Sequence, residues 1–155
     1  MKWKTCRPYA VSIVLVLALS GATGWVTFGA MDAYEAAAKS PLAPPPSAFP
    51  VIWTALSLLT GVGAAMVWRT GSPGRSRALK VCAAQLLAGF IGSILFFNLQ
   101  MYGFAFFWLL LSLALTAAMT GLFRRVSPAA AGLQIPGLIW TVFAAYLAYG
   151  VWARN

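Results

Sequence analysis

Histidine is absent from this 155-residue chain, and Asp32 and Glu35 are its only two acidic residues. Without histidine there is no imidazole general base, no imidazole metal ligand and no histidine ligand for a haem iron. Charged residues make up 8% of the chain, whereas roughly a quarter is usual in soluble domains. Because 61% of the residues are hydrophobic, a soluble fold of this length could not bury them all. The composition therefore indicates a protein whose solvent is the lipid bilayer.

Cysteine is also scarce. Cys6 and Cys82 both lie near basic segments, which in membrane proteins face the reducing cytoplasm, so we expect free thiols and no disulfide. With two dispersed thiols and two acids, the sequence predicts no metal site, no catalytic residues of the acid–base kind and no required cofactor.

Five apolar stretches are each about 20 residues long, the length at which a helix crosses the hydrocarbon core of a bilayer. The first resembles a signal peptide at its basic start, but its apolar run is longer than a signal core, so we interpret it as a retained span. The sequence predicts an all-α integral membrane protein: one domain over residues 1–155, built as a five-transmembrane-helix bundle. The predicted spans are 9–30, 49–68, 81–101, 104–123 and 133–152.

Basic residues between these stretches indicate the orientation. The positive-inside rule predicts a cytoplasmic N-terminus and an external C-terminus, most simply in a bacterial inner membrane. Nine basic residues then lie on the cytoplasmic side: Lys2, Lys4, Arg7, Arg69, Arg75, Arg77, Lys80, Arg124 and Arg125. Because they form short clusters and no helical stripe, we do not expect nucleic-acid binding.

Small residues on the spans predict where helices pack, because lipid gives helices no hydrophobic reason to associate. The third span carries Ala84, Ala88 and Gly92 at a spacing of four residues, and the first span carries Gly21 and Gly24. The fourth span has similar pairs, Ala114 with Ala118 and Ala117 with Gly121. These grooves either pack helices within one chain or form a homodimer, for which the third span is the candidate face.

Polar side chains within the spans are few, and Gln85 is the most conspicuous. With Gly89, Gly92 and Phe96 it falls on one face of the third span. Either Gln85 forms an interhelical hydrogen bond beside a seam of packed glycines, or this face is the wall of a ligand site. Since no ionisable side chain lies at mid-membrane depth, an ion pump or ion-coupled transporter is disfavoured.

Two tryptophans follow prolines near predicted helix starts: Trp53 follows Pro50 and Trp140 follows Pro136. A proline in the first turn fixes how a helix begins, and therefore where the following ring points. In the predicted topology Trp53 lies toward the external side and Trp140 toward the cytoplasmic side. We expect their rings to border one cavity at different depths.

The segment 39–56, KSPLAPPPSAFPVIWTAL, resembles the first loop and second helix of the TspO/translocator family of tryptophan-rich sensory proteins, approximately K-P-x-x-x-P-P-x-x-x-F-P-x-x-W-x-x-L. Further matches cover nearly the whole chain in order: Tyr34, Gln85-Leu86, Phe96-Phe97, Pro136 with Trp140, Leu147 and Asn155. The resemblance implies a five-helix bundle, often dimeric, with a pocket beneath the first loop for flat lipophilic molecules such as porphyrins.

The chain also departs from the family pattern. The third helix usually reads Q-L-x-x-N-x-x-W, and here Gly89 and Gly92 stand at the last two positions. The fifth helix usually has P-Y and L-N, and the loop usually carries tryptophans where this chain has Leu42 and Ser47. The two glycines would either enlarge the cavity or let helices close together.

By resemblance, the function expected is a membrane receptor that binds a porphyrin or related tetrapyrrole, preferably metal-free, beneath the 31–49 loop. The implied ligand-binding residues are Trp53, Trp140, Phe49, Pro45, Tyr34, Gln85, Gly89, Phe96 and Phe143. Two alternatives stay open: a light-dependent porphyrin-degrading enzyme, and a regulatory or structural membrane partner with a closed pocket. Leu147, Tyr149 and Arg154 also fit a weak proposed cholesterol pattern.

Overall fold

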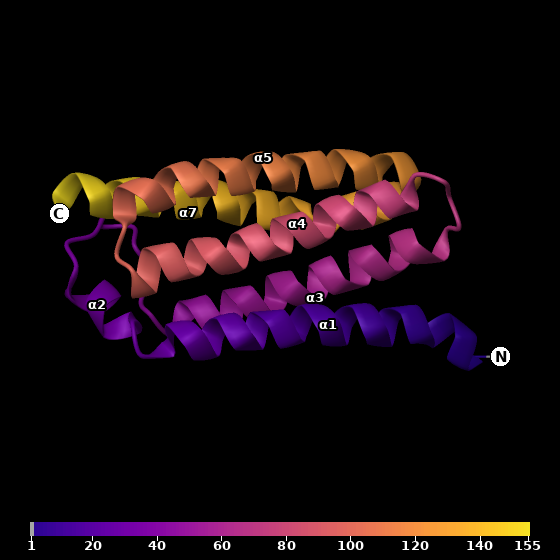
Figure 1. Cartoon of the computed structure of the whole chain (residues 1–155), viewed down its shortest axis with the longest axis horizontal. Helices are drawn as coiled ribbons and strands as arrows, with labels where there is room; N and C mark the ends of the chain where they lie inside the picture. The colour runs from indigo at the N-terminus through magenta and orange to yellow at the C-terminus, as the bar shows by residue number, and fades with distance from the viewer. Residues whose placement is uncertain (1) are drawn as a thin grey trace.

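Long helices run side by side along the whole length of the protein in the computed structural model, which describes residues 2–155 (Figure 1). Within that range, five helical segments are long and apolar enough to cross a membrane, and no strand is present. The predicted all-α five-helix membrane fold is confirmed. The elements are α1 Lys2–Phe28, α2 Met31–Ala36, α3 Ala48–Arg69, α4 Arg75–Ser93, η1 Ile94–Asn98, α5 Tyr102–Val126, α6 Pro128–Gly132 and α7 Ile135–Arg154.

The two ends of the bundle differ in their connections. The N-terminus and the α3–α4 loop lie at one end, and α2 and the C-terminus lie at the other (Figure 1). All nine basic residues expected on the cytoplasmic side therefore belong to the first end or to helix ends that reach it. The cytoplasmic assignment of that end stays a prediction.

Prolines and a serine cap define several helix starts. Pro50 lies in the first turn of α3, and Pro136 is the second residue of α7, where a missing backbone N–H breaks no helical bond. Ser127 caps α6, since its hydroxyl accepts the backbone N–H of Ala130 at 3.3 Å. The prolines at the starts of α3 and α7 agree with the sequence prediction, whereas α6 was not expected.

The connection between the third and fourth spans corrects one expectation. The predicted third span ran to Met101, with a turn around Gly103. In the structure the helix ends at Asn98, the turn comprises residues 99–101, and Gly103 lies inside α5. Gln100 adopts a left-handed φ of 53° in this turn. Gly103 serves close packing, because a Cβ there would lie 2.9 Å from the Trp152 indole.

Helix packing uses other small residues than those expected on the first and fourth spans. Gly21, Gly24 and Gly121 have no atom within 4 Å of an added Cβ, so they form no seam within the chain. The close approach of α1 to α3 instead depends on Gly61, where a Cβ would lie 2.9 Å from the Ile13 Cα. Small residues are thus used inside the bundle, at positions that spacing alone did not identify.

Two buried clusters hold the bundle. Near the C-terminal end lies an aromatic cluster: Tyr34, Phe49, Phe96, Phe97, Ala105, Leu147, Ala148 and Val151. Toward the other end lies a cluster of mostly small residues: Ala64, Val67, Ala78, Cys82, Met119, Phe123, Ala130 and Ala131. A cavity lies between them and takes wall residues from both.

Candidate functional site

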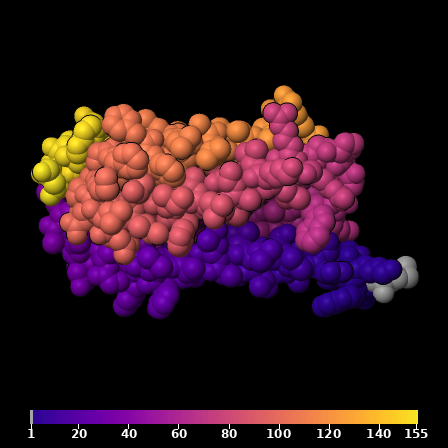
Figure 2. All heavy atoms as spheres, in the orientation of Figure 1, coloured from indigo at the N-terminus to yellow at the C-terminus, as the bar shows by residue number. Residues whose placement is uncertain are grey.

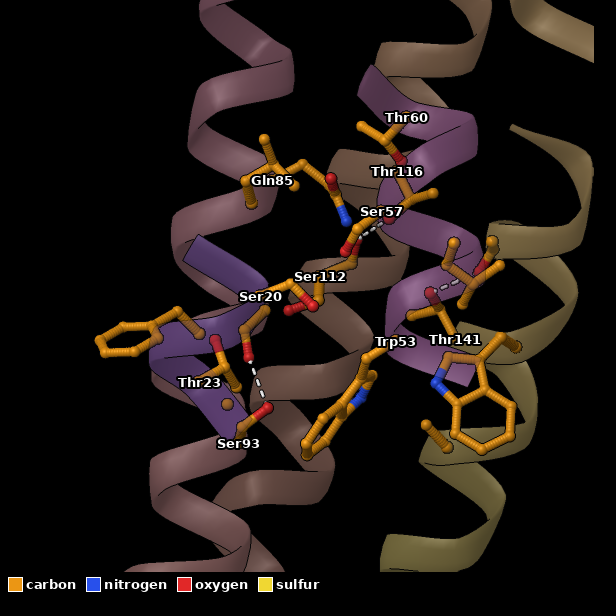
Figure 3. A pocket seen from close by; sticks show the side chains of 18 of the residues that line it. Ser20, Thr23, Trp53, Ser57, Thr60, Gln85, Ser93, Ser112, Thr116 and Thr141 are labelled. Carbon is orange, nitrogen blue, oxygen red and sulfur yellow. Dashed lines mark hydrogen bonds between the residues drawn. The ribbon is translucent and has the colours of Figure 1, made fainter. Parts of the chain in front are cut away.

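The cavity has a volume of about 200 Å³ and is lined by residues of all five long helices together with α2 and η1. Figure 3 shows side chains from several helices pointing into this space. Its walls combine aromatic, aliphatic and uncharged polar groups. No Asp, Glu, Lys or Arg of the described chain lines it.

Aromatic rings occupy the end of the cavity nearest the C-terminus. Phe49 is central: its ring centroid lies 5.8 Å from that of Trp53, 5.9 Å from Trp140 and 5.1 Å from Tyr34. Phe97 contacts the same group at 5.3 Å from Phe49 and 6.0 Å from Trp53. Edge-to-face pairs of this kind contribute about 0.5–1.5 kcal/mol each beyond area burial. The rings therefore form a packed, largely apolar end wall.

The expectation that the two tryptophans lie at different depths was wrong. Both rings border the cavity, but both also contact Phe49 in the first turn of α3, so they lie at one level. The reason is that the fifth crossing begins at Pro128, with α6, and not at residue 133. Trp140 consequently lies near the middle of the crossing, opposite the start of α3.

The proline-rich segment covers the aromatic end and is fastened at several points. Tyr34, which is 2% exposed, donates its phenol hydrogen to the Pro44 carbonyl at 2.9 Å. Burial raises the pKa of the Tyr34 phenol to about 12, so the donor proton is retained at physiological pH. Lys39 donates to the carbonyls of Tyr34 and Glu35 at 2.7 and 2.6 Å and thereby closes the end of α2.

The C-terminus ties the same segment to α7. The Asn155 side chain donates to the Ala38 carbonyl at 2.9 Å, and the Ser40 hydroxyl is hydrogen-bonded to the Tyr146 phenol at 2.6 Å. Figure 2 shows the yellow C-terminal residues lying against the purple segment at this end of the molecule. The covering segment is therefore attached both to the aromatic cluster and to α7.

A π-helical turn, η1, delivers two of the aromatic rings. Its wider turn places Phe96 and Phe97 consecutively in the buried cluster, and both line the cavity. A regular α-helix turns adjacent side chains about 100° apart, and π turns inside helices occur frequently at functional sites. This element was not expected from the sequence.

The predicted face of the third span does line the cavity: Gln85, Gly89, Gly92 and Phe96 are all wall residues. The two glycines behave differently. No atom lies within 4 Å of a Cβ at Gly89, so that position opens into the cavity. At Gly92 a Cβ would lie 3.0 Å from Trp108 Cδ1, and the Trp108 indole donates to the Ala88 carbonyl at 2.8 Å. The Ala88–Gly92 groove is thus filled by α5 of the same chain.

Most of the polar wall was not predicted from the sequence. Apart from Gln85, the wall consists mainly of serine and threonine hydroxyls, which hydropathy treats as nearly neutral and which therefore gave no signal. The polar wall residues besides Gln85 are Ser20, Thr23, Ser57, Thr60, Ser93, Ser112, Thr116, Gln134 and Thr141. Gln134 is 2% exposed and fits against Gly63, where a Cβ would collide with its Nε2 atom. The Thr60 hydroxyl donates to the Gln134 Oε1 at 3.3 Å.

The remaining predicted residues lie elsewhere. Pro45 is exposed and Phe143 packs behind Trp140 at 5.6 Å, and neither belongs to the cavity wall. Leu147 lines the cavity, whereas Tyr149 is 52% exposed on the outer surface, because residues two apart in a helix point in nearly opposite directions. Arg154 donates to the Gly150 carbonyl of its own helix at 3.0 Å. The three residues of the cholesterol pattern therefore share no common surface.

Comparisons with known proteins agree with this architecture. A model of the TspO/MBR family matches residues 10–153. The chain belongs to the TspO/MBR family. It is 35% identical to the translocator protein of Ovis aries over 125 residues, which cover 79% of this chain and 74% of that protein. It is 30% identical to the tryptophan-rich protein TspO of Archaeoglobus fulgidus over 145 residues, covering 93% of this chain and 94% of the relative. A TspO/MBR protein with five apolar helices is an integral, multi-pass membrane protein.

Proposed function

We propose that this TspO/MBR protein is a membrane receptor for a planar lipophilic ligand, with a porphyrin or related tetrapyrrole as the leading class. The observation that carries the proposal is that Trp53 and Trp140, from separate helices, border one uncharged cavity beneath a fastened loop. Indole faces stack on flat conjugated molecules, and the absence of nearby charge favours a lipophile.

The size of the cavity adds a condition. At about 200 Å³ it is smaller than the roughly 300–1,000 Å³ typical of ligand sites, so a whole macrocycle needs the aromatic end to open. The segment that covers this end is held by a few hydrogen bonds from Tyr34, Ser40 and Asn155. Opening that segment would expose the Trp53 and Trp140 rings without disturbing the long helices.

The chemistry of the walls favours a ligand held by stacking over one held by a metal. Among the described residues, no group of three His, Cys, Asp or Glu side chains could hold a metal ion. A metal-free porphyrin therefore suits the site better than one whose iron needs a protein ligand. A closed-pocket partner protein is less well supported, because an open space remains beside Gly89.

Titration of the purified protein with protoporphyrin, followed through tryptophan emission, tests the proposal. The double variant Trp53→Ala plus Trp140→Ala should bind at least about tenfold more weakly, since two indole contacts of about 1 kcal/mol each are removed. The matched control is Trp3→Ala plus Trp25→Ala, which removes two indoles that are 73% and 83% exposed on the outer surface. Equal affinity in both double variants, or no binding by the wild type, would contradict the proposal.

Illumination of the same complex separates the enzyme alternative from binding. Accumulation of a ring-opened product with bilin-like absorbance, dependent on Trp53 and Trp140, would favour degradation. An unchanged porphyrin spectrum would favour a receptor.

A further inference from the structure

The hydroxyls of the cavity wall differ in how they use their protons. Four of them use their protons within their own helices, donating to the carbonyl four residues earlier at 2.7–3.0 Å. They are Thr23, Ser93, Thr116 and Thr141. Each such hydroxyl presents only oxygen lone pairs to the cavity. These four hydroxyls therefore offer a ligand acceptors and no free proton.

Two further polar atoms in this region have no partner. Among the described residues, Gln85 Oε1 and Ser112 Oγ are the buried side-chain atoms without a hydrogen bond. Ser112 is 2% exposed, and both residues line the cavity. Figure 3 shows Gln85 extending from its helix toward Ser57 and Ser112. Gln85 Oε1 can only accept, whereas the Ser112 hydroxyl can accept or donate. Polar groups left unpaired in a buried site are costly, so a ligand group that pairs with them is favoured.

An anion cannot be that group. No basic side chain of the described chain reaches the cavity wall, and an unpaired carboxylate in such surroundings is far more costly than a neutral polar group. The opposite end of the cavity is aromatic and, among the residues that the structure describes, carries no unpaired polar atom of this kind. The cavity thus combines an aromatic end with unpaired polar atoms at Gln85 and Ser112.

We propose that Gln85 and Ser112 form a subsite that selects an uncharged hydroxyl on a planar lipophilic ligand. Such a hydroxyl donates to Gln85 Oε1 and can accept from the Ser112 hydroxyl. This inference rests on the proposed function and adds an orientation to it. The flat part of the ligand lies against Trp53 and Trp140, its hydroxyl reaches Gln85 and Ser112, and any carboxylate it carries points outward.

Three pyrene probes with the same ring test this subsite: 1-pyrenebutanol, 1-butylpyrene and 1-pyrenebutyrate. Each is titrated into the full-length protein in detergent micelles, with energy transfer from tryptophan as the signal. The alcohol should bind about tenfold more tightly than the butyl compound, the advantage of one additional hydrogen bond. The carboxylate should bind most weakly at neutral pH.

Variants assign the effect to the two residues. In Gln85→Leu and in Ser112→Ala the ratio of alcohol affinity to butyl affinity should fall toward one. Ser93→Ala is the matched control, because Ser93 lies in the same cavity and on the same helix as Gln85 but its proton is already used. Comparing ratios between variants cancels the partitioning of each probe into micelles. The control should keep the wild-type ratio.

The outcomes separate the two proposals. The wild type could bind the alcohol and butyl probes equally, with binding still dependent on Trp53. That result overturns the subsite but not the receptor, and would mean that a bound water pairs with Gln85 and Ser112. A preference that survives both variants also overturns the subsite. Failure of every probe to bind overturns receptor and subsite together.

Discussion

Gly89 and Gly92 lie one turn apart on α4 and should respond in opposite ways to the same substitution. In Gly89→Phe the new ring enters the cavity, because no atom lies within 4 Å of the added Cβ. The free energy of unfolding should change by less than about 1 kcal/mol, since no packed group is displaced. Ligand binding should be lost, because the ring occupies the space beside Gln85.

In Gly92→Phe the new ring meets Trp108, whose Cδ1 lies 3.0 Å from the position of the added Cβ and whose indole is fixed by its bond to the Ala88 carbonyl. Overpacking of about 1–3 kcal/mol plus the loss of that hydrogen bond gives a destabilisation of about 2–4 kcal/mol. The measurement is unfolding in a mixed-micelle titration with dodecyl sulfate, followed by circular dichroism.

The reciprocal exchange provides the control. Gly92→Trp combined with Trp108→Gly moves the indole from α5 to α4 and should recover part of the stability lost in Gly92→Trp alone. The two sites are in contact, so a coupling of about 0.5–3 kcal/mol is expected. The packing described for α4 and α5 is incorrect if Gly89→Phe and Gly92→Phe lose equal stability. It is also incorrect if the stability changes of Gly92→Trp and Trp108→Gly simply add in the double variant.

Three further predictions concern the covering segment and Gln134. Tyr34→Phe removes the bond to Pro44 and should increase hydrogen exchange at residues 37–47 while the long helices keep their protection. Burial raises the Tyr34 pKa from about 10 in the unfolded chain to about 12, so the stability that Tyr34 contributes is complete below pH 10 and is lost as pH rises toward 12. The free energy of unfolding of the wild type should therefore fall more than that of Tyr34→Phe between pH 7, 10 and 11.5. An equal fall in both proteins would contradict this. Gly63→Ala should destabilise the protein by about 1–3 kcal/mol, because it displaces the buried Gln134 amide, and Gly121→Ala is the control at an open position.

The fold could be predicted because the bilayer imposes one strong rule, about 20 apolar residues per crossing. The same rule failed at the turn of residues 99–101, where Leu99 and Met101 are apolar and the hydropathy signal continues through the break. It also missed α6, which precedes α7 in the fifth crossing.

The aromatic half of the candidate site was accessible from the sequence, since Trp53 and Trp140 follow prolines that fix helix starts. The polar half was not. A serine or threonine that donates to its own helix is compatible with lipid, with packing or with a cavity wall, and only the arrangement of helices distinguishes these. Ser112 and Thr116 face the cavity because of how the helices are arranged, and their spacing in the sequence does not predict it.

The departures from the family pattern on α4 have a joint physical consequence. The indole missing at Gly92 is replaced in space by Trp108 of α5, so packing is preserved. The amide missing at Gly89 is not replaced, because no atom lies near that position. An asparagine there would lie four residues after Gln85, the spacing at which two helical amides can pair. Its absence leaves Gln85 Oε1 unpaired and adds room beside it. Glycine at this position therefore leaves both the open space and the acceptor that the proposed ligand would use, and Gly89→Asn should reverse both by filling the space and pairing Gln85 within the protein.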